Sequence, residues 1–162
     1  MGGTGSGTTD LVLQKLTNLF PKNFTICYEV VPPPSTIGQD SVSVYNNMLS
    51  LYGKETCTME ILVDNEALYR VCESHLGIES PSFPDINKLV ADHASSLTSG
   101  SRFGGAKGSS FVDLCGNLMA YPRIRHFFPA MPPPRREDGD LADQVLETFD
   151  KANHLLTLPS KR

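Results

Sequence analysis

The 162-residue sequence contains no tryptophan and only four cysteines, at positions 27, 57, 72 and 115. No two of these cysteines form a C-x-x-C pair, so we expect neither a structural zinc site nor a dithiol motif. We expect reduced, partly buried thiols instead. The four histidines lie far apart on separate segments, and we expect packed or solvated side chains there and no metal: His75, His93, His126 and His154.

Long apolar runs and blocks of like charge are also absent. No stretch approaches the roughly 20 apolar residues that cross a bilayer, and the first residues, Met-Gly-Gly-Thr-Gly, lack the basic and apolar regions of a signal peptide. We therefore expect an intracellular chain with no membrane partner. The 18 acidic and 14 basic residues give a formal net charge of −4. Without a basic patch, nucleic acid is not an expected partner.

What is present is an alternation of strand and helix patterns. At this length a single domain buries roughly 70% of the surface that its unfolded chain exposes. Helical periodicity and capping residues predict helices over 8–20, 45–51, 64–76, 82–101, 111–119 and 141–156. Runs of β-branched and aromatic residues predict strands over 24–31, 59–63 and 124–130. The alternation predicts an α/β domain around a mostly parallel sheet.

A glycine-rich segment, Gly-Gly-Thr-Gly-Ser-Gly-Thr-Thr over 2–9, runs directly into the first predicted helix. Glycines let the backbone turn its N–H groups toward one point, and the helix N-terminus adds a partial positive charge. This pattern suits phosphate oxygens, although it lacks the lysine of a P-loop and is no dinucleotide fingerprint. The alternative is a flexible tail or an expression remnant, and composition alone favours neither.

Four segments, in the same order along the chain, resemble the tubulin family. Gly-Gly-Thr-Gly-Ser-Gly resembles the family's signature loop, and Val-Asp-Asn-Glu-Ala-Leu-Tyr over 63–69 resembles the start of the helix whose Asn touches guanine. Ser-Pro-Ser-Phe-Pro-Asp-Ile-Asn-Lys-Leu-Val over 80–90 resembles the start of the core helix. Tyr-Pro-Arg-Ile-Arg-His-Phe-Phe over 121–128 resembles the strand that enters the intermediate domain.

The resemblance implies a set of nucleotide-binding residues. Asn65 and Asn87 would hydrogen-bond the guanine, and Phe83 would stack on it where the family usually has tyrosine. The ribose loop would be 30–43, with Ser43 at the family's acidic position and Asp40 as a displaced candidate. For the two asparagines the alternative is helix capping or a solvated first turn. The phosphate oxygens would be held by Gly2, Gly3, Thr4, Gly5, Ser6 and Gly7.

The resemblance also implies a catalytic residue that acts on a neighbouring subunit. Segment 104–114 is similar to the family's inter-subunit loop, with Gly108 and Ser110 replacing its asparagine and first aspartate. Asp113 stands at the position of the catalytic acid, where a carboxylate could orient an attacking water. The alternative is a solvent-facing acid on the helix 111–119.

The fold implied by the resemblance is the C-terminal half of a tubulin-type nucleotide-binding domain. Residues 1–100 would form a partial tubulin/FtsZ-type GTP-binding domain including the core helix. Residues 101–162 would form the inter-subunit loop, helix, strand and helix at the start of the intermediate domain. In the family, the segments that hold Mg²⁺ and the α- and β-phosphates precede the glycine loop. We therefore expect GTP or GDP at an incomplete site, and no Mg²⁺ ligands here.

Three functional hypotheses follow from the resemblance. The first is a guanine-nucleotide-associated structural constituent or interactor of microtubules, in the cytoplasm and cytoskeleton, with tubulin-like subunits or the microtubule lattice as partners. The second is a GTPase subunit that hydrolyses GTP at a longitudinal subunit interface, which would need another chain to supply the missing half-site. The third is a non-functional fragment of a longer tubulin gene. The isolated chain is not expected to be an enzyme.

Overall fold

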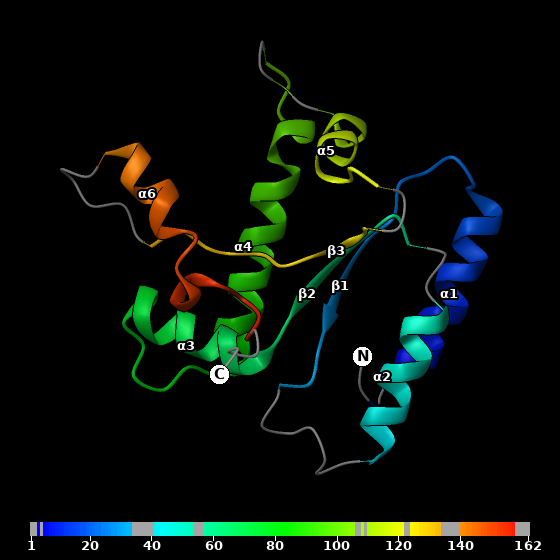
Figure 1. Ribbon diagram of the computed structural model, residues 1–162, viewed down its shortest axis with the longest axis horizontal. Helices are drawn as coiled ribbons and strands as arrows, with labels where there is room; N and C mark the ends of the chain where they lie inside the picture. Colours follow the sequence, from blue (N-terminus) through cyan, green and yellow to red (C-terminus); the bar gives the residue numbers. More distant parts are fainter. Residues whose placement is uncertain are drawn as a thin grey trace.

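The computed structural model describes residues 3, 5–33, 41–53, 57–105, 108, 110–121, 124–133 and 140–157, with the side chains of 51–53 excepted. Its centre is a parallel sheet in the order β1-β2-β3 (Figure 1), formed by β1 (Ile26–Val30), β2 (Met59–Val63) and β3 (His126–Phe127). In the β1–β2 register Cys27 lies opposite Glu60. The expected α/β class with a parallel sheet is confirmed.

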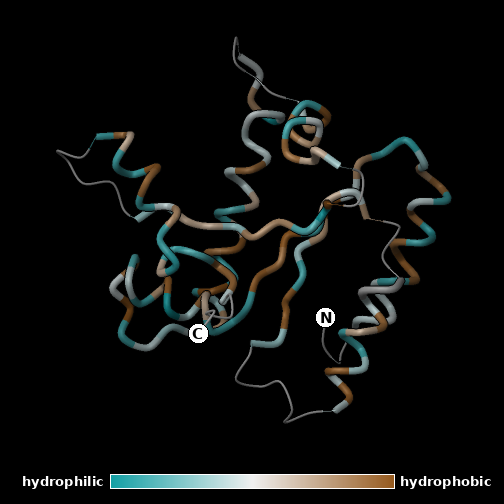
Figure 2. Tube along the Cα trace, viewed as in Figure 1, coloured by the Kyte–Doolittle hydropathy of each residue, from teal (hydrophilic) through white to brown (hydrophobic). Residues whose placement is uncertain are grey.

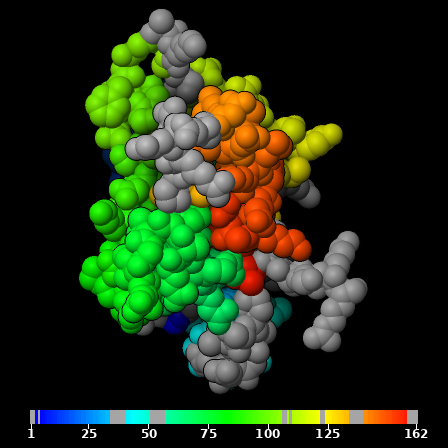
Figure 3. Space-filling model, turned by 90° about the vertical axis from the view of Figure 1, so that its left-hand side faces the viewer, coloured from blue at the N-terminus to red at the C-terminus, as the bar shows by residue number. Residues whose placement is uncertain are grey.

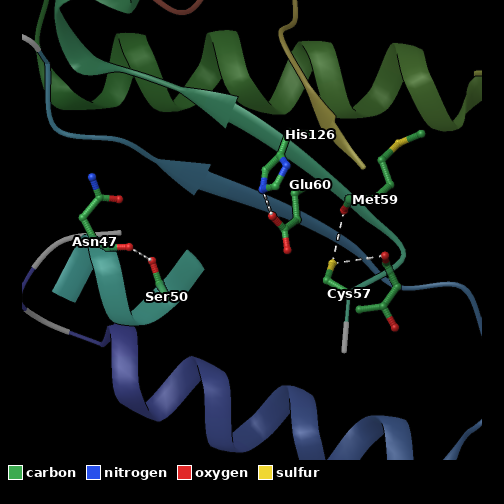
Figure 4. A network of polar contacts seen from close by, with 7 residues as sticks. Asn47, Ser50, Cys57, Met59, Glu60 and His126 are labelled. Carbon is green, nitrogen blue, oxygen red and sulfur yellow. Dashed lines mark hydrogen bonds and ion pairs between the residues drawn. The ribbon is translucent and has the colours of Figure 1, made fainter. Parts of the chain in front are cut away.

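Helices lie on both sides of this sheet. The close view in Figure 4 shows α4 on one side, and α2 and α1 on the other. The helices are α1 (Ser6–Leu19), α2 (Ser41–Gly53), α3 (Asn65–Leu76), α4 (Phe83–Arg102), α5 (Phe111–Leu118) and α6 (Leu141–Glu147), followed by a 3-10 turn, η1 (Lys151–Asn153). Figure 2 shows the mostly hydrophobic colouring of the central strands, as expected for strands covered on both faces.

The apolar core falls into two clusters on the α4 side. One joins the β-strands to α4 and α5 through Met59, Ile61 and Cys115, with Leu97 and Phe127 packed against them. The other joins α3, α4 and the C-terminal segment, and comprises Val63, Leu68, Val71, Cys72, Ile86, Leu89 and Leu155. Figure 3 shows this junction from outside, where the orange and red C-terminal part lies against the green helices.

Two predicted elements are wrong. The strand predicted over 124–130 pairs only at His126–Phe127, because Pro129 has no N–H and the chain then turns so that Ala130 bridges His154 antiparallel. The helix predicted over 141–156 ends at Glu147, where Asn153 Nδ2 donates to the Glu147 carbonyl at 2.6 Å. Leu155 and Leu156 are buried in the segment that follows η1 rather than in a helix.

The four cysteines, all within the described residues, form no disulfide, and all but Cys27 are buried. A hydrogen bond with the Cys27 side chain, together with burial, raises the pKa of the Cys57 thiol. Burial raises the pKa of Cys72 and of Cys115. In the described part of the chain, no cluster of three His, Cys, Asp or Glu residues could hold a metal ion. No helix among the described residues is long and apolar enough to span a membrane.

The half-buried histidine His93 should make stability depend on pH. The Tyr28 hydroxyl lies 2.8 Å from His93 Nδ1, and burial lowers the pKa of His93. As pH falls through about 6.5, the ordinary histidine pKa, the unfolded chain takes up a proton that the folded chain resists, so stability is lost. We expect the urea midpoint to fall between pH 7.5 and 5.5, and to fall less in His93→Gln. Equal falls would contradict this account.

Candidate functional site

The candidate site lies at the edge of the sheet where the parallel strands β1 and β2 end. Figure 1 shows the N-terminal ends of α1, α3 and α4 on this side of the sheet. In open α/β sheets, ligands bind outside the carboxyl ends of the strands, and helix N-termini there favour anions. The helices α1, α3 and α4, which begin with described members of the predicted phosphate and guanine sets, therefore point their N-termini toward the same end of the sheet.

The glycine loop leads into α1 through Gly5, whose φ of 85° lies in the left-handed region that favours glycine. The Gly5 carbonyl accepts hydrogen bonds from the Thr9 N–H at 2.9 Å and from the Thr9 hydroxyl at 2.8 Å. A Cβ on Gly3, Gly5 or Gly7 would meet no atom within 4 Å, so open space adjoins the backbone. Because Gly5 has no side chain to cap the helix, the first-turn N–H groups can donate to an anion.

The loop departs from expectation in one respect. The helix begins at Ser6 rather than at residue 8, so Ser6 and Gly7 belong to its first turn. The Ser6 hydroxyl donates to the Gly3 carbonyl at 3.3 Å. Gly2 and Thr4 lie outside the described residues, and their predicted contacts with phosphate stay predictions.

The two asparagines do not cap the helices that carry them. Asp64 caps α3 by accepting from the Ala67 N–H at 2.6 Å, which leaves Asn65 as the first helical residue. At α4, Asp85 accepts from the Ser82 N–H at 2.8 Å. The hydrogen bonds from Ser82 lower the pKa of Asp85. Asn87, one turn into α4, is exposed. Both amides are available for a contact other than capping.

An aromatic contact joins the N-terminal parts of α3 and α4. The Tyr69 and Phe83 rings meet edge to face, with centroids 6.5 Å apart. Asn65 precedes Tyr69 by four residues, and Asn87 follows Phe83 by four residues, so each asparagine shares a helix face with one ring of the pair. The Phe83 side chain is 66% exposed, which leaves ring surface for a stacked base. The pair joins the two helices that carry the three predicted guanine residues, and sequence analysis missed Tyr69 as the partner of Phe83.

Behind the glycine loop is a cavity of about 460 Å³ between the sheet and the helices α1 and α2. Its lining includes Gly5, Ser6 and Gly7 at one end and the carboxylates Asp10, Glu29 and Glu60. An interior lined by carboxylates repels phosphate. A phosphate held by the α1 N-terminus would therefore lie outside this cavity.

Sequence analysis also missed the acidic centre of the sheet, which Figure 4 shows. Glu60 is fully buried and lies 2.8 Å from Nε2 of His126 on the adjacent strand. Nearby, the Cys57 thiol donates to the carbonyls of Met59 and Thr25 at 3.2 and 3.3 Å. The available signal was a glutamate within each of two otherwise apolar strands, at positions 29 and 60.

Asp113 lies far from this edge. Its carboxylate accepts from the Ser110 N–H at 3.3 Å, and the Ser110 hydroxyl accepts from the Val112 N–H at 3.2 Å, so both residues cap α5. Asp113 is exposed on α5, and Figure 1 shows α5 beside the C-terminal end of α4. The 20 residues of α4 extend about 30 Å at 1.5 Å per residue. One chain therefore cannot bring Asp113 to its own candidate nucleotide site.

The predicted ribose loop is only partly described. Residues 34–40, Asp40 among them, lie outside the described residues. Ser43 lies in the first turn of α2 and is half-buried. Its predicted place in the ribose pocket stays a prediction.

A family model and the related proteins found by comparison agree on one family. A family model described as "Tubulin/FtsZ family, GTPase domain" matches residues 1–73. Mouse "Tubulin alpha chain-like 3" is 35% identical over 96% of this chain and 36% of its own length. The "Tubulin beta chain" of Porphyra purpurea is 36% identical over 94% of this chain and 35% of its own length. "Tubulin alpha-1B chain" of Schizophyllum commune is 30% identical over 99% of this chain and 37% of its own length. The chain spans about a third of the length of these curated relatives.

Proposed function

Because this chain belongs to the tubulin family and corresponds to part of its GTPase domain, we propose that it binds guanine nucleotide and associates with tubulin-like subunits or the microtubule lattice. Its place in the cell would be the cytoplasm and cytoskeleton. Tubulin-family proteins bind GTP or GDP in general, and the proposal is that this chain keeps the base-binding half of such a site.

The observation that supports the proposal is the edge-to-face contact between Tyr69 and Phe83, which joins the two helices that carry Asn65 and Asn87. An exposed aromatic ring and two amides have the chemistry needed to stack on a purine and hydrogen-bond its edge. The uncapped N-terminus of α1 supplies N–H donors for a phosphate group at the same end of the sheet.

In the proposed site, base and phosphate would be held without metal ligands supplied by this chain. No cluster of metal ligands occurs in the part of the chain that the structure describes, and the carboxylates Asp10, Glu29 and Glu60 face the cavity behind α1. A nucleotide bound by the base, and by one helix N-terminus, would lack part of the electrostatic stabilisation that phosphoryl transfer needs. The proposed function of the isolated chain is thus binding rather than hydrolysis.

Titration with fluorescent GTP, GDP and ATP analogues tests nucleotide binding. Phe83→Ala should weaken guanine-nucleotide binding about fivefold or more, because base–aromatic stacking contributes about 1–3 kcal/mol. Phe103→Ala is the matched control: it removes a similarly exposed ring, 68% against 66%, just beyond the other end of α4. That variant should bind within about twofold of the wild type.

Two results would contradict the binding proposal. One is the absence of saturable binding at high micromolar protein, and the other is an equal effect of the two phenylalanine variants. A chain that neither binds nucleotide nor sediments with assembled microtubules would support the third hypothesis, a non-functional fragment of a longer tubulin gene.

A second proposed function is GTP hydrolysis across a longitudinal interface, with Asp113 facing the nucleotide of a neighbouring subunit. The observation that favours it is the separation of about 30 Å along α4 between the candidate guanine residues and Asp113. A site divided between the two ends of a chain is completed only when subunits stack end to end.

A further inference from the structure

Two of the four cysteine thiols meet where β1 and β2 begin. Cys27 lies in β1, opposite Glu60 of β2, and Cys57 precedes β2 by two residues. Both residues line the cavity of about 460 Å³ behind the glycine loop, and a hydrogen bond joins their side chains. The two thiols are therefore neighbours in the fold, although they lie 30 positions apart in the sequence.

The backbone next to Cys57 is held in place by Thr25. The Thr25 carbonyl accepts from the N–H groups of Thr58 and Met59 at 3.0 and 3.1 Å. The Thr25 N–H donates to the Thr58 hydroxyl at 3.2 Å. Two successive residues that face one residue of the partner strand form the arrangement of a β-bulge, which redirects a side chain locally. These contacts fix the Cys57 thiol beside Cys27.

Oxidation of Cys57 would cost the fold few hydrogen bonds. The thiol donates to the carbonyls of Thr25 and Met59 at 3.3 and 3.2 Å (Figure 4). A thiol is a weak donor, and the Thr25 carbonyl keeps its two backbone N–H partners without it. Two thiols in contact have a reaction that neither has alone, which is oxidation to a disulfide.

Cys115 is the competing partner for Cys57, because both line a second cavity, between the C-terminal end of α1 and α5. Cys115 packs in the apolar cluster with Met59 and Ile61, whereas the Cys57 side chain is hydrogen-bonded to Cys27. The contact therefore favours Cys27 as the partner.

We propose that Cys27 and Cys57 are a redox-reversible modification site, at which a hydroperoxide converts the two thiols into a disulfide. Peroxide first oxidises the Cys27 sulfur to a sulfenic acid, and one water leaves. The Cys57 sulfur then attacks the Cys27 sulfur: the S–S bond forms, the S–O bond breaks, and the hydroxyl takes the Cys57 proton and leaves as a second water. A dithiol reductant restores both thiols by exchange. This inference does not rest on nucleotide binding.

The order of these steps follows from burial. Cys27 is half-buried, whereas Cys57 is 4% exposed. The hydrogen bond with Cys27, together with burial, also raises the pKa of Cys57. A buried thiol that stays protonated reacts slowly with peroxide, so Cys57 is the thiol that closes the disulfide rather than the one that is oxidised first.

Tryptic mapping tests the pairing, because each cysteine falls in a tryptic peptide of its own. In chain order these peptides are 23–54, 55–70, 71–88 and 108–123. The full chain, reduced and then treated with hydrogen peroxide before its thiols are blocked, should yield 23–54 linked to 55–70 as the main disulfide. Dithiothreitol should remove this link. A main link between 55–70 and 108–123, or links mainly between two chains, would overturn the proposal.

The same reaction in the urea-unfolded chain is the control for the fold. In an unfolded chain the shorter loop closes more readily, and Cys57 and Cys72 are only 15 positions apart. Peptide 55–70 should then link mainly to 71–88. The same distribution of links in folded and unfolded chains would show that the fold does not direct the oxidation, against the proposal.

Serine variants separate the roles of the two thiols. Cys57→Ser keeps a hydroxyl donor for the same carbonyls, so it should fold, lose the link and accumulate a sulfenic acid at Cys27 that dimedone traps. Cys27→Ser should lose the link without comparable trapping at Cys57. Cys72→Ala, the matched control, should form the link as the wild type does. An undiminished disulfide yield in Cys27→Ser, or equal trapping at the two positions, would contradict the proposed reaction.

Discussion

Replacing Asp64 by alanine should lower the free energy of unfolding by about 3 kcal/mol. The Asp64 side chain is almost fully buried. One oxygen accepts from the Ala67 N–H at 2.6 Å as the cap of α3, and the other accepts from the Thr157 N–H. Loss of a cap costs about 0.5–2 kcal/mol, and a buried donor left unpaired costs about 1–3 kcal/mol more.

Urea unfolding followed by circular dichroism measures this loss. Asp140→Ala is the matched control, because Asp140 also caps a helix, accepting from the Ala142 N–H at 3.4 Å, but is exposed. It should cost less than about 1 kcal/mol. Asp64→Asn keeps one acceptor oxygen, so its loss of unfolding free energy should lie between those of Asp64→Ala and Asp140→Ala. Similar losses of unfolding free energy in Asp64→Ala and Asp140→Ala would contradict this account, because burial and the second hydrogen bond of Asp64 would then add no stability.

Asp113→Ala should abolish most of any GTP hydrolysis that the chain stimulates in tubulin. If Asp113 orients the attacking water on a neighbouring subunit's nucleotide, its loss removes a general base, which is typically responsible for a factor of about 10² or more. The measurement is phosphate release by tubulin with the chain added, minus release by tubulin alone, alongside co-sedimentation with microtubules.

A structural effect of this substitution must be separated from a catalytic one, because Asp113 also caps α5. Asp113→Asn keeps an acceptor oxygen for the Ser110 N–H but cannot act as a base, so it should sediment normally and still lose stimulation. Asp143 is an exposed acid in the first turn of α6. Asp143→Ala should change neither sedimentation nor the stimulation of GTP hydrolysis. Full stimulation by Asp113→Asn would remove Asp113 from the mechanism.

The elements that local sequence signals specify were predicted closely. The strand over 59–63 has the predicted limits. The helix predicted over 64–76 is α3, with Asp64 as its N-cap, and it ends before Gly77, whose φ of 63° favours glycine. Ser82 and Asp85 mark the start of α4 in the same way. Caps and stops act within a few residues, so their chemistry is visible in the sequence.

The errors lie where distant contacts determine the backbone. The helical periodicity over 141–156 continues past Glu147, yet Leu155 takes its place by donating to the Pro129 carbonyl at 2.9 Å. The strand predicted over 124–130 pairs with β2 only as far as Phe127. Neither partner can be identified from local periodicity, because the two halves of each contact lie tens of residues apart.

The same distinction between local sequence signals and distant contacts applies to the candidate site. The resemblance brought out Asn65, Phe83 and Asn87 as residues of one group, but the edge-to-face partner of Phe83 is Tyr69 on another helix. The pairing of Glu60 with His126 joins two strands that are separated by more than 60 residues. Sequence analysis found the residue types that suit a nucleotide; the neighbours that position them required the fold.

The hydrogen bond from the Asp64 N–H to the Leu155 carbonyl, 3.0 Å long, also affects when the molecule can fold. Leu155 is fully buried in the cluster of α3 and α4, so this cluster remains open on the ribosome until Leu155 has emerged. Contacts between residues so far apart in sequence close late, because the intervening loop must first lose entropy. Until then the apolar faces of α3 and α4 would be exposed to chaperones, and nascent-chain stability should rise steeply once Leu155 is accessible.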